Sequence, residues 1–253
     1  MNYFMRIAFR GRDFYGTQKL KNYLTVQSLL EEKLSGIFDE DIKVKIGSRL
    51  DRGVSALDFG VNFKTKIAKL EPNKLLYVLN RLLPKCIRIK ECKEVADDFN
   101  ARYDAISKTY LYVIEKDKSN PLLIDMCWHP IFNFDVEKLR KVSKLYVGDY
   151  CFDYFGSEEE KDGKVLSIDD VWVEEKDGYI LWRVKGKSFL RYQVRFMIGT
   201  AYEIAANRAD IEEITSRLSG INKTTSHYKA PASGLILEKV DYDFERSEKL
   251  AKK

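Results

Sequence analysis

The first half of the chain divides into six segments by the spacing of its apolar residues. Alternation with a period of two predicts strands, and spacing near 3.6 residues predicts helices. Thr25 is a candidate N-cap for the first helix, and Pro72 suits the first turn of the second. The order is strand, helix, strand, strand, helix, strand, which is the split-βαβ, ferredoxin-like pattern. We expect strands at 3–9, 41–47, 57–65 and 87–95 and helices at 26–37 and 72–83.

The second half repeats this order without an obvious repeat in sequence. A turn at Lys176-Asp177-Gly178 predicts a hairpin, and Gly220 is placed to end a short additional helix. We expect an α+β protein with an N-terminal domain at 1–103, a C-terminal domain at 104–243 and a charged tail at 244–253. In the second half we expect strands at 108–114, 168–174, 179–184 and 234–242 and helices at 136–146, 188–207 and 211–218.

Composition narrows the class of protein. The 253 residues are 45% hydrophobic, which permits a sizeable core and excludes global disorder. No run of about 20 apolar residues is present, so no membrane span is expected. Arg6, Arg10 and Arg12 interrupt the N-terminal segment, which lacks the apolar core of a signal peptide. We expect a cytoplasmic protein.

The cysteines and the net charge restrict the possible functions less than the overall composition does. The four cysteines show no C-x-x-C spacing, and the only histidines are His129 and His227, so the sequence predicts neither a structural zinc site nor a disulfide framework. The net charge of +5 permits nucleic-acid binding but does not require it, because basic residues must also cluster on one face.

The densest candidate for chemistry is the segment Gly47–Ala56, between two predicted strands. Asp51 stands there between Arg49 and Arg52. Neighbouring cations favour an ionised carboxylate, which a carboxylate nucleophile requires. A charged turn with solvated side chains, in which Gly53 supplies a positive φ, explains the same residues.

Six segments together resemble, in order, those of the tRNA pseudouridine synthase A family. Each segment is weak evidence alone, but they span nearly the whole chain. They are Phe14–Gln18, Thr25–Glu31, Gly47–Ala56, Ala101–Arg102 with Lys108–Tyr112, Phe189–Arg195 and Ala230–Leu235.

The resemblance implies an enzyme that isomerises uridine to pseudouridine in tRNA, within the anticodon stem-loop. Asp51 matches the family's nucleophilic aspartate and Tyr110 its active-site tyrosine, which can stack on a base or transfer a proton. Arg195 matches the arginine that pairs with the catalytic carboxylate. No metal, nucleotide or redox cofactor is implied.

Further matches imply substrate-binding residues. Arg49, Arg52 and Arg191 are candidate RNA contacts, and Leu235 matches an apolar residue of the pocket. The residues alone allow plainer roles: Tyr110 shares a strand face with Tyr112, Arg191 and Arg195 could line one solvated helix face, and Leu235 could be strand core. The basic residues that could form an RNA track are Arg10, Arg12, Lys19, Lys21, Arg52, Lys187 and Arg191.

The family resemblance also implies a homodimer with tRNA lying across both subunits. It implies two ferredoxin-like domains related by pseudo-two-fold symmetry, with antiparallel sheets joined around a central RNA-binding cleft. Two alternatives stay open: a catalytically inactive tRNA-binding relative, and a small-molecule enzyme on duplicated ferredoxin-like domains. The chain departs from the family pattern at Thr17, Ser48, Leu50 and Ser55, and at Asp149–Phe152, where no histidine stands.

Overall fold

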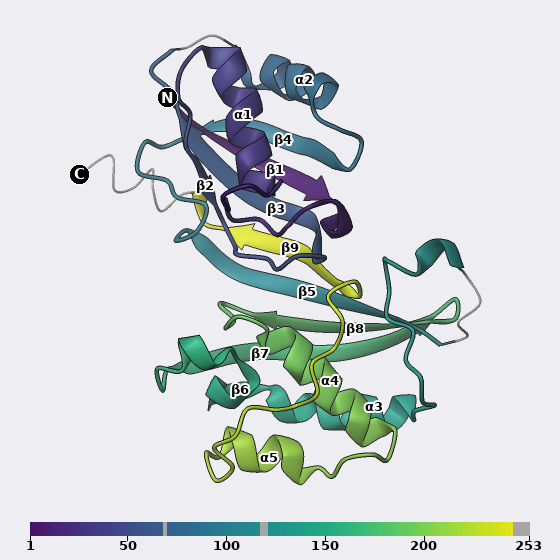
Figure 1. Cartoon of the computed structure of the whole chain (residues 1–253). Coiled ribbons are helices and arrows are strands. Elements are labelled where there is room, and N and C mark those ends of the chain that lie inside the picture. The colour runs from purple at the N-terminus through teal and green to yellow at the C-terminus, as the bar shows by residue number, and fades with distance from the viewer. Residues whose placement is uncertain (68–69, 117–120, 245–253) are drawn as a thin grey trace. The chain divides into compact units, whose positions relative to one another are not determined.

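The computed structural model describes residues 1–67, 70–116 and 121–244 (Figure 1). The chain forms two compact units. One comprises Met1–Ile106 together with the chain from Leu237 onward, and the other comprises Ser107–Ile236. The last predicted strand, which we assigned to the C-terminal domain, therefore lies for most of its length in the first unit. The predicted tail at 244–253 lies outside the described residues, apart from Phe244.

The described residues form a mixed α+β protein with mainly antiparallel sheet. The first half contains β1 (Asn2–Phe9), α1 (Val26–Phe38), β2 (Val44–Ile46), β3 (Ser55–Lys64), α2 (Pro72–Leu82) and β4 (Ile87–Val95). The second half contains β5 (Ala105–Glu115), α3 (Val136–Ser143), β6 (Gly148–Cys151), β7 (Val165–Lys176), β8 (Tyr179–Gly186), α4 (Gln193–Ala205), α5 (Glu212–Leu218) and β9 (Leu235–Tyr242).

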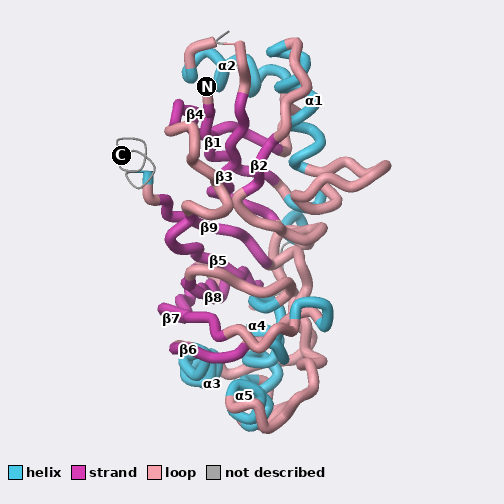
Figure 2. Tube along the Cα trace, turned by 90° about the vertical axis from the view of Figure 1, so that its left-hand side faces the viewer, coloured by secondary structure: helices cyan, strands magenta, loops and turns pink. Residues whose placement is uncertain are grey.

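The sheet of the first unit runs in the order β4-β1-β3-β9, with β2 also paired to β3. The β1–β3 and β1–β4 pairs are antiparallel. Figures 1 and 2 show α1 along one face of these strands. The ring of Phe38 at the end of α1 contacts the rings of Tyr3 and Phe63, so aromatic packing fixes the helix to the sheet.

The sheet of the second unit runs in the order β5-β8-β7-β6, and its pairs are antiparallel. Helices α3 and α4 are attached to the rest of the unit by buried hydrogen bonds. Trp182 in β8 donates to the hydroxyl of Ser143 in α3 over 2.8 Å, and Tyr146 donates to the Met197 carbonyl in α4 over 3.0 Å. These partners satisfy polar groups that would otherwise be costly to bury.

Most predicted elements are present, and two differences matter for the site. The helix predicted at 188–207 begins only at Gln193, because Tyr192 adopts a left-handed φ of 67°. The prediction was therefore wrong for residues 188–192, and Arg191 and Arg195 do not share a helix face. The sequence analysis also missed the four-residue strand β6.

In the described part of the chain, no helix combines the length and apolar character that crossing a membrane requires.

Candidate active site

The loop that carries Asp51 connects β2 to β3 in the first unit. Thr17 holds this loop from a neighbouring segment: its hydroxyl donates to the Ser48 carbonyl over 3.2 Å and accepts from the Leu50 amide over 2.9 Å. The Thr17 amide also donates to the Leu50 carbonyl. The Leu50 side chain is buried, so two hydrogen bonds and one apolar anchor fix the residue that precedes Asp51.

Asp51 itself is half-buried, whereas Arg49 and Arg52 are exposed. The Asp51 carbonyl accepts from the Val54 amide over 3.2 Å, which closes a turn. Gly53 supplies the positive φ of 88° in that turn, as the plainer interpretation of the sequence also expected. The turn is therefore real, and it presents a carboxylate from a fixed backbone between two exposed guanidinium groups.

Exposed aromatic rings accompany Arg52. Its guanidinium lies 4.1 Å from the ring centre of Tyr15, and the rings of Tyr15 and Tyr23 lie 4.4 Å apart. Tyr15 is 39% exposed and Tyr23 is 50% exposed. Two solvent-facing tyrosines beside an arginine offer the stacking surface that unpaired nucleotides use. The sequence analysis named Arg52 but neither tyrosine, although Tyr15 lies within the Phe14–Gln18 segment.

In the second unit, Tyr110 and Tyr112 occupy alternate positions of β5 and are both buried. The Tyr110 ring makes an edge-on contact with Phe189, with ring centres 5.1 Å apart. The Tyr112 hydroxyl donates to the Pro231 carbonyl over 2.8 Å. Burial raises the pKa of Tyr112 well above its ordinary value, and the nearby charge of Arg195 opposes that shift. Tyr112 therefore has a structural task, and Tyr110 packs against a different partner.

Arg195 lies in the first turn of α4 and is half-buried. Its Nε donates to the Ala230 carbonyl over 2.8 Å, and the Ala230 amide donates to the Arg195 carbonyl over 3.1 Å. This pair of bonds joins the start of α4 to the Ala230–Leu235 segment, so that two of the family-like segments meet here.

Three cations surround one aromatic ring at the same end of α4. The ring centre of Tyr192 lies 4.7 Å from the Arg191 guanidinium, 5.5 Å from that of Arg195 and 4.4 Å from the Lys229 ammonium. We call Arg191, Tyr192, Arg195 and Lys229 the basic ring cluster. The sequence analysis named neither Tyr192, although it lies within the Phe189–Arg195 segment, nor Lys229, which is distant from the arginines in sequence.

The chain segment that reaches Leu235 passes close to two elements of the second unit. An added Cβ at Gly199 would collide with the Tyr228 carbonyl, and one at Gly234 would lie 2.7 Å from the Tyr112 ring. The Gly234 carbonyl accepts from the Val113 amide of β5 over 2.9 Å. Leu235 follows and is 5% exposed, so the plainer expectation that it belongs to the core also describes it.

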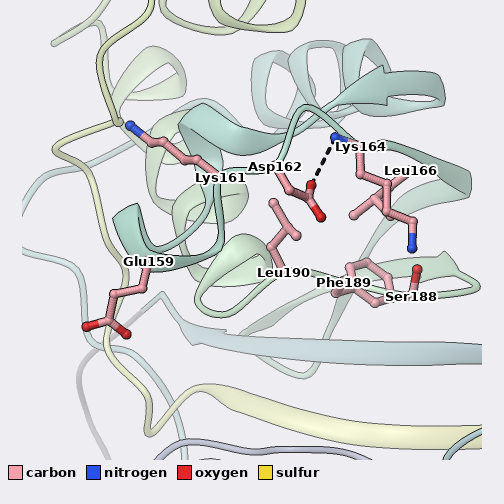
Figure 3. Close-up of a pocket in the computed structure, with 8 residues that line it drawn as sticks. All are labelled: Glu159, Lys161, Asp162, Lys164, Leu166, Ser188, Phe189 and Leu190. Carbon is pink, nitrogen blue, oxygen red and sulfur yellow. Dashed lines mark hydrogen bonds between the residues drawn. The ribbon is translucent and has the colours of Figure 1, made fainter.

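A hollow of about 360 Å³ lies in the second unit beside Phe189, the ring partner of Tyr110 (Figure 3). Lys161, Asp162 and Lys164 contribute charged groups to its lining. The Lys164 amide donates to the Asp162 carboxylate over 2.9 Å. None of the predicted catalytic residues lines this hollow, so we do not assign the reaction to it.

Several residues of the predicted basic track make ion pairs. Arg10 pairs with Asp13 over 2.5 Å, Lys19 with Glu31 over 2.7 Å and Arg191 with Glu159 over 3.2 Å. Lys21 and Lys187 are exposed. Five of the track residues, Arg10, Arg12, Lys19, Lys21 and Arg52, belong to the first unit, and Lys187 and Arg191 belong to the second.

The departures from the family pattern have distinct structural consequences. Thr17 holds the loop as described, and the Ser55 hydroxyl accepts from the Gly11 amide over 3.0 Å. The Ser48 hydroxyl is buried without a hydrogen-bond partner among the described residues. Asp149, Tyr150 and Cys151 lie in β6, and Phe152 is buried directly after it.

Comparison with known proteins gives one consistent result. The sequence model of a family described as tRNA pseudouridine synthase matches residues 5–104 and 142–243. A tRNA pseudouridine synthase A of Aquifex aeolicus (strain VF5) is 39% identical over 240 residues, which cover 94% of this chain and 98% of the relative. That of Dictyoglomus thermophilum is 37% identical over 244 residues, covering 96% and 100%. That of Mycoplasmoides gallisepticum is 33% identical, covering 96% and 91%.

Proposed function

The chain belongs to the tRNA pseudouridine synthase family, and on this premise we propose that it isomerises uridine to pseudouridine in tRNA. The observation that carries the proposal is the extent of the match. It covers the loop with Asp51, the strand with Tyr110 in the full-length relatives, and the start of α4 with Arg195. The enzyme is an isomerase, since its product has the atoms of its substrate.

The chemistry requires one bond to break and another to form. The bond between N1 of uracil and C1′ of the ribose breaks, the ring turns, and C5 joins C1′ while the C5 proton leaves to solvent. We assign the nucleophile to Asp51, because its turn presents a carboxyl group flanked by two arginines. A carboxylate can hold the detached fragment covalently while the other fragment turns.

Tyr110 and Arg195 take the supporting roles in this proposal. Tyr110 is buried against Phe189 and can stack on the target base or relay the proton from C5. Arg195 has a guanidinium with a permanent charge and an orientation fixed by the Ala230 carbonyl. We propose that it supports the ionised state of Asp51 during the reaction.

RNA binding rests on two groups of side chains. In the first unit, Arg49 and Arg52 flank the nucleophile, with Tyr15 and Tyr23 as stacking surface. In the second unit, the basic ring cluster offers cations to phosphate groups. Because phosphate contacts release counterions, Lys229→Ala should weaken tRNA binding and reduce its dependence on salt, whereas Lys239→Ala, a lysine paired with Asp241, should change neither.

We assign the anticodon stem-loop as the target, following the family pattern. Primer extension on tRNA transcripts treated with carbodiimide after incubation with the enzyme tests this directly, because pseudouridine adducts stop the polymerase. Stops confined to the anticodon stem-loop are the expected result. A tRNA that binds in a salt-dependent way but never acquires a stop would favour the inactive binding relative instead. Absence of both binding and stops would contradict the tRNA assignment.

We also propose a homodimer that works in the cytoplasm, where tRNA is modified. An exposed apolar segment of the second unit, between Leu122 and Phe132, supports self-association, since large apolar patches on a surface mark interfaces. Light scattering of the wild type and of Ile131→Asp measures it, with a dimer expected for the former and a monomer for the latter. The segment contains Leu122, Ile124, Met126, Ile131 and Phe132, which are between 42% and 86% exposed.

We propose a finer statement about the fold, that both halves descend from ferredoxin-like units. The β-α-β-β-α-β order of the first half supports it, and the second half follows the same order with β6 and α5 added. In the first unit β2 also pairs with β3, so its first four strands lie in the order β4-β1-β3-β2.

A further inference from the structure

The end of β5 and the segment 127–129 bring together three side chains that bind metals. A parallel bridge aligns Ile114 with Trp128, and the Glu115 amide donates to the Trp128 carbonyl over 2.9 Å. Side chains alternate along paired strands. The side chains of Cys127 and His129 therefore point to the face opposite that of Trp128. The side chain of Glu115, the neighbour of Ile114, points to this same opposite face.

The donor atoms of these three side chains converge. Oε2 of Glu115 lies 2.8 Å from Nδ1 of His129, and Sγ of Cys127 lies 3.4 Å from Nε2 of the same ring. Sγ and Oε2 are 3.8 Å apart. Glu115 is 3% exposed and Cys127 is 2% exposed, while the His129 side chain is 21% exposed. The cluster is therefore largely shielded from water and open only along the imidazole.

Hydrogen bonds to Glu115 Oε2 over 3.8 Å and to the Leu123 carbonyl over 3.2 Å satisfy the Cys127 thiol, but the geometry does not suit hydrogen bonds from both nitrogens of the His129 ring. The two nitrogens of an imidazole direct their proton and lone pair away from each other in the ring plane. Two partners only 3.8 Å apart cannot both lie along those directions. A cation among the donors would satisfy sulfur, nitrogen and oxygen at once and would neutralise a buried carboxylate.

The donor atoms lie close enough together for one ion, which would bind a single nitrogen of the His129 ring. The distance from Cys127 Sγ to His129 Nε2 is 3.4 Å, and that from Sγ to Glu115 Oε2 is 3.8 Å. Zinc binds thiolate, imidazole and carboxylate at about 2.0–2.3 Å, so that tetrahedral ligands lie roughly 3.3–3.6 Å from one another. The mixed set of soft sulfur and borderline nitrogen favours zinc over magnesium or calcium, which prefer oxygen ligands alone. We propose that Glu115, Cys127 and His129 form a zinc site, with water completing the coordination.

The site is structural. Glu115 lies five positions beyond Tyr110, about 17 Å along an extended strand. Its ligands join the end of β5 to the segment that continues from the exposed apolar residues at 122–126 into 127–129. The proposal is independent of the isomerase assignment, and it runs against our sequence expectation of no metal. That expectation rested on the absence of C-x-x-C pairs, whereas this set of ligands is Cys-x-His with a glutamate twelve residues before the cysteine.

Metal analysis of the full-length protein, expressed in zinc-supplemented medium, tests the proposal without reference to activity. Wild type should retain one zinc ion per chain, and Cys127→Ser and His129→Ala should bind zinc more than about 100-fold more weakly. Cys151→Ser is the matched control, since Cys151 lies in β6 of the same unit outside the cluster. Cobalt added to the apoprotein should give a sulfur charge-transfer band with wild type and Cys151→Ser but not with Cys127→Ser.

Thermal melting of the wild type provides a readout that does not depend on the variants folding. Zinc should raise the melting temperature of protein treated with chelator, and magnesium should leave it unchanged. The proposal is overturned if wild type retains no zinc and zinc does not raise its melting temperature. It is equally overturned if folded Cys127→Ser and His129→Ala retain zinc as the wild type does.

Discussion

At the scale of single residues, adjacent positions of the loop have different roles: Leu50 anchors the loop, and Asp51 is the candidate nucleophile. Leu50 is buried and held by Thr17, and the next residue, Asp51, is half-buried. Arg49 and Arg52 project into solvent on either side. The charge pattern of this loop was readable from the sequence. The anchoring was not, because Thr17 lies over thirty residues away and its hydroxyl gives no periodic signal.

Ser48 is the loop position where the structure predicts a gain in stability. Its hydroxyl is buried without a described partner, and an unsatisfied buried hydroxyl costs about 1–3 kcal/mol. Ser48→Ala should therefore raise the free energy of unfolding by about 1 kcal/mol while tRNA modification is retained. Urea unfolding at neutral pH measures the change.

Ser55→Ala is the matched control for that measurement. The Ser55 hydroxyl accepts from the Gly11 amide, so its removal should lower the free energy of unfolding by about 1 kcal/mol. If both alanine variants lose stability to a similar extent, the Ser48 hydroxyl has a partner and the interpretation of the loop is incorrect.

At the scale of elements, the start of α4 determines where the basic side chains lie. Apolar spacing correctly predicted that a helix is present, but it extended the helix five residues too far. The reason is local: Tyr192 takes a left-handed conformation, and the Gln193 side chain accepts from the Leu190 amide at 2.8 Å. Helix α1, by contrast, begins where predicted because Thr25 and Ser28 form a reciprocal cap.

The contact between α4 and the segment at 228–230 gives a prediction at this scale. A methyl group at Gly199 would collide with the Tyr228 carbonyl, a backbone atom that cannot turn aside. Gly199→Ala should cost about 1–3 kcal/mol of stability, as overpacking does, and should lower the turnover rate by displacing the Ala230 carbonyl from Arg195.

Gly36→Ala is the control for a glycine within a helix. Gly36 is exposed in α1, and an added Cβ there meets nothing within 4 Å. This substitution should raise stability by about 0.5–1 kcal/mol through helix propensity alone. Equal effects of the two substitutions would show that Gly199 is not needed for close packing.

At the scale of the whole molecule, the proposed machinery is divided between the two units. Asp51 belongs to the first unit, and Tyr110 and Arg195 belong to the second. The order of elements in the first half could be predicted from hydrophobic spacing, and so could that of the second half apart from β6. The return of the chain to the first unit from residue 237 could not, because which sheet a strand joins depends on contacts distant in sequence. The Glu115, Cys127 and His129 cluster was invisible for the same reason.

Asp51 is the proposed nucleophile of this isomerase, and the loss of the C5 proton depends on it. Release of tritium from tRNA that carries tritium at C5 of uridine measures the loss of the C5 proton directly. The wild type should release tritium, and Asp51→Asn should reduce the rate by at least about 10³-fold. Asp41→Asn should match the wild type, because Asp41 is an exposed aspartate of the same unit that pairs with Lys43. Tritium release by Asp51→Asn at the wild-type rate would contradict the account.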